Sequence, residues 1–143
     1  MSAGHLPQVG QSGRYVVLRH CFRTVAAESH SETPAPRHRG EHYDWMFAVD
    51  GVLLTWASEQ WLAATVAAGV AALQLPPHRL AYLDYEGEVS GDRGTVQRVE
   101  AGTHRLLQAA ADRYEFAVQG GRTGVMMLYR TASSDSWTIA FAP

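Results

Sequence analysis

Residues 40–57 read GEHYDWMFAVDGVLLTWA, and this stretch decides the fold. The Asp50-Gly51 dipeptide accepts the positive φ angles of a two-residue hairpin turn, so it predicts two antiparallel strands. The register set by this turn pairs Val49 with Val52, Phe47 with Leu54, and Trp45 with Trp56. Because side chains alternate between the two faces of a strand, these large apolar residues share one face, which we expect to be a core.

The opposite face of the same hairpin carries His42, Asp44 and Met46, with Thr55 and Ala57 on the partner strand. The small neighbours predict an open polar site on a rigid support. An imidazole and a carboxylate two positions apart suit Mn²⁺, Fe²⁺ or Zn²⁺, and their spacing does not choose among these ions. The same pattern is also typical of a hydrogen-bonded surface pair that binds no metal.

A third ligand would complete a metal site, and His20 is the candidate by position. Residues 15–20 favour a strand that ends at His20. Residues 21–41 are rich in Ser, Pro and charges, and we interpret them as a loop insertion that returns the chain to His42. Taken alone, His20 also fits as an ordinary residue at the end of a strand.

Composition sets broad limits on function. A chain of 143 residues predicts one domain with a substantial core, and a formal net charge of −2 gives no overall attraction to nucleic acid. All twelve basic residues are arginine, which excludes a Walker lysine or a Schiff-base lysine. Cys21 is the only cysteine, which excludes an internal disulfide framework. No apolar run is long enough to span a bilayer and no signal pattern opens the chain, so we expect a cytoplasmic protein.

The rest of the chain predicts a mainly β fold, a small and mostly antiparallel barrel with at most one or two short helices. We expect a loose lead-in over residues 1–14 and a single domain over residues 15–143. The alanine-rich residues 58–70 predict a short helix. Further strands are expected at 71–75, 95–100, 113–119, 123–130 and 137–142, with a turn at 101–102.

Several polar residues have two interpretations at this stage. We expect Asp84 and Glu86 on one strand face with Tyr82, either orienting a ligand histidine or forming a solvated face. His104 follows the expected turn at 101–102, and we assign it no role.

The motifs taken together resemble the 3′-phosphoesterase domain that is attached to bacterial DNA ligase D, and its stand-alone relatives. The matching pieces occur in the family's order and cover nearly the whole chain. They are YVVLRH at 15–20, HYD at 42–44, DGVL at 50–53 with WA at 56–57, HRLAYLDYEG at 78–87, GTV at 94–96, and the region 121–137.

This resemblance implies a compact β-barrel that binds Mn²⁺, with Zn²⁺ or Fe²⁺ as alternatives. It implies removal of a 3′-terminal ribonucleoside or a 3′-phosphate from DNA ends during repair. The implied metal ligands are His20, His42 and Asp44, the implied phosphate-contacting histidine is His78, and Tyr82 is a functional neighbour. The implied partners are a nucleic-acid 3′ end or a smaller phosphoester, and a repair protein.

The chain also departs from the family pattern at three cationic positions. Met46 replaces an arginine, Gln60 aligns with a lysine, and Val70 lies near another arginine position. Each charge-assisted bond to an anion contributes about 1.5–3 kcal/mol, so these losses weaken the expected phosphate pocket. Arg37 and Arg39 in the loop insertion either return over the site or remain solvated.

Three functions therefore stay open on the sequence alone. The first is a metal-dependent phosphoesterase acting on nucleic-acid 3′ ends or a smaller phosphorylated molecule. The second is a catalytically impaired module that binds nucleic-acid ends or a partner protein, because cationic positions are lost. The third is a facial-triad metal oxygenase, because H-x-D with a distal histidine also describes that site.

Overall fold

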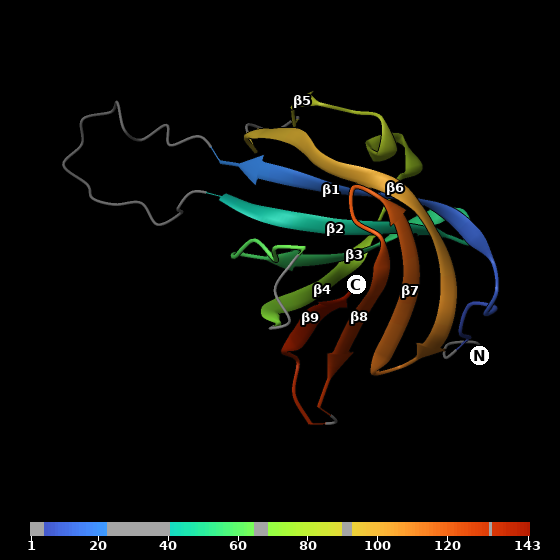
Figure 1. Ribbon diagram of the computed structural model, residues 1–143. Coiled ribbons are helices and arrows are strands. Elements are labelled where there is room, and N and C mark those ends of the chain that lie inside the picture. The colour runs from blue at the N-terminus through green and yellow to red at the C-terminus, as the bar shows by residue number, and fades with distance from the viewer. Residues whose placement is uncertain (1–4, 23–40, 65–68, 90–92, 132) are drawn as a thin grey trace.

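A computed structural model describes residues 5–22, 41–64, 69–89, 93–131 and 133–143 (Figure 1). These residues form a mainly β, antiparallel fold, as the sequence predicts, with one short 3₁₀ helix among them. The elements are β1 (Ser12–Cys21), β2 (Glu41–Val49), β3 (Val52–Ser58), β4 (Val70–His78), η2 (Leu80–Leu83), β5 (Gly87–Glu88), β6 (Thr95–Ala110), β7 (Arg113–Gly120), β8 (Gly124–Arg130) and β9 (Trp137–Ala142). No described helix is long and apolar enough to cross a membrane.

Eight strands close into a barrel. Their order is β1-β2-β3-β4-β9-β8-β7-β6, and β6 pairs back onto β1. Every pairing is antiparallel, and the two-residue β5 adds to the edge of β6. Closure leaves these eight strands without a free sheet edge.

The central hairpin has the predicted register. Val49 pairs with Val52, Phe47 with Leu54, and Trp45 with Trp56. Asp50 and Gly51 have φ angles of 52° and 84°, which the tight turn requires.

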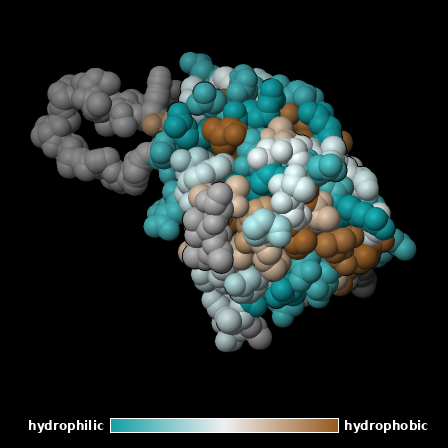
Figure 2. Space-filling model, viewed as in Figure 1, coloured by the Kyte–Doolittle hydropathy of each residue, from teal (hydrophilic) through white to brown (hydrophobic). Residues whose placement is uncertain are grey.

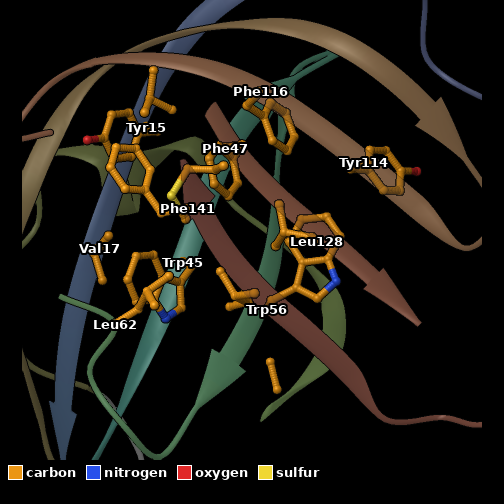
Figure 3. Packing of buried hydrophobic residues seen from close by; sticks show 14 of the residues in the cluster. Tyr15, Val17, Trp45, Phe47, Trp56, Leu62, Tyr114, Phe116, Leu128 and Phe141 are labelled. Carbon is orange, nitrogen blue, oxygen red and sulfur yellow. The ribbon is translucent and has the colours of Figure 1, made fainter. Parts of the chain in front are cut away.

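The apolar face of this hairpin lies in the barrel interior (Figure 3). Phe47 stacks on Phe116 with their ring centroids 4.0 Å apart, and Trp56 packs edge-on against Phe47. Trp45, Phe47 and Trp56 are fully buried. Each buried side chain of this size contributes about 1.5–3 kcal/mol of hydrophobic stabilisation, so this face dominates the core.

The opposite face of the hairpin is not the open polar surface expected from the sequence. Met46 is 1% exposed and belongs to a second apolar cluster on the outside of the barrel wall. The cluster is formed by Val16, Leu18, Met46, Leu53, Leu83, Val89 and Val96. Residues 79–89, which include η2 and β5, cover this face and lie outside the barrel in Figure 1. The expectation of an open face was wrong because the hairpin sequence does not reveal this cover.

An ion pair fastens the cover to β1. Asp84 follows η2 directly, and its carboxylate accepts two hydrogen bonds from the Arg14 guanidinium, the shorter at 2.8 Å. These bonds hold the pKa of Asp84 below its usual value. Tyr82 lies in η2, so the expectation that Tyr82, Asp84 and Glu86 share a strand face was wrong.

Three further expectations differ from the structure. The helix expected at 58–70 is not formed by residues 58–64, 69 and 70, and residues 65–68 lie outside the described part of the chain. The strand expected to end before Pro76-Pro77 continues as β4 to His78. Prolines are tolerated there because the β3–β4 pairing is irregular at that point and β9 pairs only with the start of β4.

The third expectation, a turn at residues 101–102, is wrong because β6 runs unbroken through this point. A Cβ atom on Gly102 would lie 2.2 Å from the backbone oxygen of Gln119, so glycine here permits the close approach of β7 rather than a turn.

Figure 2 shows a mixed molecular surface, with apolar patches separated by hydrophilic residues.

Candidate metal centre

The three expected metal ligands come together on the outer face of the barrel, at one end of the β1–β2 pair. His20 on β1 lies directly opposite His42 on β2, and Asp44 follows two positions along β2 on the same face. One ligand atom from each of the three residues lies within 4.8 Å of the others. The antiparallel register therefore converts an H-x-D pair and a distant histidine into one cluster.

The distances suit ligands arranged around a shared ion. His42 Nε2 lies 3.0 Å from Asp44 Oδ1, and His20 Nδ1 lies 3.8 Å from Asp44 Oδ2. Metal–ligand bonds of about 2.0–2.2 Å place neighbouring ligand atoms about 3–3.5 Å apart. Small side-chain adjustments would bring all three residues to a common divalent cation.

The hydrogen bonding of His20 leaves its Nδ1 atom available as a metal ligand. Its Nε2 lies 2.6 Å from the backbone carbonyl oxygen of Arg93. A carbonyl only accepts hydrogen bonds, so Nε2 carries the proton of the neutral ring, and Nδ1 keeps its lone pair toward Asp44. A backbone carbonyl that holds the second ring nitrogen in this way is a common feature of metal-binding histidines.

Asp44 provides the strongest test of whether the residues fit a cation. This residue is 4% exposed, and its buried Oδ1 atom makes no hydrogen bond, although His42 Nε2 lies 3.0 Å away. A buried carboxylate oxygen without a hydrogen bond is costly, and a cation bound to it would remove that cost. Two imidazoles with one carboxylate are a donor set that Mn²⁺, Fe²⁺ and Zn²⁺ accept. The described residues therefore fit a divalent metal ion.

Phe22 supports the site, and the sequence analysis missed it. Its ring stacks on His20 with centroids 4.4 Å apart and lies 5.3 Å from the His42 ring. This packing restricts the orientation of both imidazoles. The signal in the sequence was the two-residue spacing from His20, which places Phe22 on the same side of the chain. Arg37 and Arg39 lie outside the described residues.

His78 and Tyr82 contact each other, with ring centroids 5.9 Å apart, and they are not part of the three-ligand cluster. His78 Nδ1 donates a hydrogen bond to the Pro76 carbonyl oxygen at 2.9 Å. His78 pairs with Leu53 on β3, which itself pairs with Ala48, four residues along β2 from Asp44. Four residues correspond to about 13 Å of strand.

A groove of about 470 Å³ adjoins the three-ligand cluster on the side of β3 and β4, and His42 forms part of the groove wall. Ala57, which pairs directly with Asp44, is also a lining residue. The remaining lining residues are Ser58, Glu59, Gln60, Ala71, Ala72, Leu73 and Ser136. The volume falls within the range of about 300–1,000 Å³ that is typical of small-molecule sites.

The fold and the site define a class of protein: a closed antiparallel β-barrel with two histidines and an aspartate on its outer wall, close enough together to hold a metal ion. A family model, described as the DNA ligase D 3′-phosphoesterase domain, matches residues 35–139. The chain belongs to this family. No curated protein matches the sequence.

The matched region contains four of the five site residues predicted from the sequence. His42, Asp44, His78 and Tyr82 lie inside it, whereas His20 lies before its first residue. His20 reaches the site through the pairing of β1 with β2. Family membership supports a phosphoesterase-like role for the chain.

Proposed function

We propose that this protein is a metal-dependent phosphoesterase that removes a phosphate or a ribonucleoside from nucleic-acid 3′ ends. The observation that carries the proposal is the buried carboxylate of Asp44 beside two histidines, with an Oδ1 atom that makes no hydrogen bond, in a chain of a phosphoesterase family. The proposal includes a role in repairing DNA ends, which the family description supports, and it places the protein in the cytoplasm alongside repair proteins.

In the proposed mechanism, His20 Nδ1, His42 Nε2 and an oxygen of Asp44 hold the ion, with Mn²⁺ preferred and Zn²⁺ or Fe²⁺ as alternatives. A divalent ion there would supply an activated water and offset charge on a phosphate oxygen. Asp44 contributes negative charge from a rigid strand. The Arg93 carbonyl and Phe22 keep the imidazole of His20 oriented, so that its lone pair is available without reorganisation.

The proposal assigns His78 and Tyr82 to substrate contact, because they match functional positions of the resembled family. His78 would donate a hydrogen bond to the phosphate or protonate the leaving 3′ oxygen, which requires the substrate-bound protein to close the distance of about 13 Å of strand between His78 and the ligands. His78→Ala should therefore slow phosphate release by about a hundredfold and leave the metal-induced rise in melting temperature unchanged. Loss of that thermal shift in the variant would instead place His78 in metal binding.

The test of the proposed function is phosphate release from a 3′-phosphorylated oligonucleotide with and without Mn²⁺. We expect slow, Mn²⁺-dependent release by the wild type and loss of release in Asp44→Asn. Asp112→Asn is a matched control because it removes an exposed carboxylate at the β6–β7 turn. Equal release by the Asp44→Asn variant, or release that chelation of metal does not affect, would refute the proposal.

A second candidate is a module that binds 3′ ends without cleaving them. The observation that favours it is the burial of Met46, which leaves the position two residues beyond Asp44 without a polar group for a phosphate. This candidate predicts Mn²⁺-dependent binding of the same oligonucleotide with no release of phosphate over hours.

A further inference from the structure

The walls of the groove beside His42 lack the positive charge that an extended nucleic-acid strand requires. Among the described lining residues there is no arginine, and the exposed Glu59 adds a carboxylate. Proteins that bind single strands place cations along the backbone, because neutralising the phosphates supplies most of the affinity. This groove would repel the phosphates of a strand.

The same walls suit an uncharged group with an apolar face. Leu73 is 57% exposed, and its pairing partner Ala57 and the nearby Ala71 are small. Gln60 and Ser136 are exposed and offer an amide and a hydroxyl for hydrogen bonds. An apolar surface with a few polar groups is the usual composition of a small-molecule site.

The position of the groove determines the direction in which a bound molecule would extend. Ala57 lies directly opposite Asp44, so the groove begins beside the metal-binding carboxylate. Along β2, the residue that follows Asp44 on this face is Met46, which is buried beneath residues 79–89 and leaves no space for a ligand there. A molecule with its phosphate at the three ligands would therefore extend across β3 and β4.

We propose that the groove binds the single terminal nucleoside of a 3′-phosphorylated substrate, so that a mononucleotide-sized phosphoester binds at least as tightly as a long strand. This inference rests on the proposed phosphoesterase function and names its substrate class. Affinity comes from one phosphate at the metal and one nucleoside in the groove. Additional nucleotides contribute nothing, because no described cation in the groove meets their phosphates.

Binding can be measured without relying on catalysis. Calorimetry on the Mn²⁺-loaded protein would compare inorganic phosphate, a nucleoside bearing a non-hydrolysable 3′-phosphonomethyl group, and an octanucleotide with the same terminus. We expect the nucleoside compound to bind about tenfold more tightly than phosphate, and the octanucleotide no more tightly than the nucleoside compound. Raising the salt concentration should weaken both nucleoside-containing ligands to a similar extent.

Two groove variants sharpen the comparison. Leu73→Arg adds a cation to the groove and should improve octanucleotide binding about threefold or more relative to the nucleoside compound. Glu59→Gln removes the repelling carboxylate and should act in the same direction. Leu107→Arg is the matched control, because Leu107 is an exposed leucine on β6, on a distant part of the barrel wall. The control should leave the preference between the two ligands unchanged.

The results separate this inference from the proposed function. Octanucleotide binding tenfold tighter than that of the nucleoside compound, or nucleoside binding no tighter than that of phosphate, would overturn the inference even if the wild type releases phosphate. An unchanged preference in Leu73→Arg would also overturn it. Absence of phosphate release from every substrate, with the expected order of binding retained, would refute the esterase proposal and support the groove.

Discussion

At the scale of single residues, we propose that Asp44 determines whether the site binds a metal. Mn²⁺ or Zn²⁺ should raise the melting temperature of the wild type, because an ion bound only to the folded state stabilises it by about 2.7 kcal/mol at a hundred times its Kd. Asp44→Asn keeps the shape of the side chain but removes the charge, so it should abolish the shift measured by thermal denaturation. An equal shift in the variant would remove Asp44 from the site.

The burial of Met46, two residues beyond Asp44, could not be predicted from the sequence. On an open polar face, an arginine at this position would bind phosphate. Met46 is instead packed in the outer apolar cluster. Met46→Arg should therefore destabilise the protein by several kcal/mol through a buried, unpaired charge, and it should not speed phosphate release.

Met46→Leu is the control for this substitution, because it conserves volume and should cost less than about 1.5 kcal/mol. Urea denaturation of both variants provides the measurement. If Met46→Arg unfolded at the wild-type urea concentration, the cover formed by residues 79–89 would have to be loose.

At the scale of elements, the sequence is most informative where a local rule applies. Asp50-Gly51 and the alternation around it predict the β2–β3 register, and that register was confirmed. The unbroken β6 could not be predicted, because Gly102 reads as a turn residue until the approach of Gln119 is known. His20 could be placed beside His42 from the order of the strands, but its carbonyl partner Arg93 is remote in sequence.

Arg122, between β7 and β8, contacts both β6 and the segment that follows β3, and its replacement should lower the free energy of unfolding. Its guanidinium makes two hydrogen bonds to Glu100 on β6, at 2.8 and 3.0 Å, and one to the Leu62 carbonyl oxygen. The Tyr15 hydroxyl donates to the same carboxylate, and burial is the largest cause of the raised pKa of Tyr15. Arg122→Met should destabilise the protein by about 3–5 kcal/mol, because it leaves Glu100 buried without its cation.

The double variant Arg122→Met/Glu100→Gln tests that explanation for Arg122. Replacing the carboxylate by a neutral amide should restore part of the lost free energy of unfolding, measured by denaturant titration. If the double variant were less stable than Arg122→Met alone, the cost would come from packing. The guanidinium also lies over the rings of Trp45 and Phe141, at 5.3 and 5.0 Å, which is the packing that such a result would implicate.

At the scale of the whole molecule, closure of the barrel brings distant strands together across β1. His104 on β6 donates a hydrogen bond from Nε2 to the Ala48 carbonyl oxygen on β2, at 2.8 Å. Gly13 on β1 lies between them, and a Cβ atom there would be 2.6 Å from the same carbonyl oxygen. This bond unites three strands only because the middle residue has no side chain.

The same histidine predicts how stability depends on pH. Burial lowers the pKa of His104 below the ordinary value of about 6.5, and its ring packs against Phe47 and Phe116. Below pH of about 6.5 the unfolded chain gains a proton at this position that the folded protein does not, so the free energy of unfolding falls as pH falls. The fall continues down to the lowered folded-state pKa, with a slope of up to about 1.4 kcal/mol per pH unit.

His104→Gln isolates this contribution from those of the other histidines. A glutamine amide can donate to the Ala48 carbonyl but does not titrate, so the variant should lose less stability than the wild type between about pH 7 and pH 5. The measurement is the melting temperature across that range at constant ionic strength. The variant is expected to be less stable at every pH, because it loses the ring contacts, and the slope is therefore the informative quantity. Parallel slopes for the two proteins would show that His104 takes up its proton equally in the folded and unfolded states.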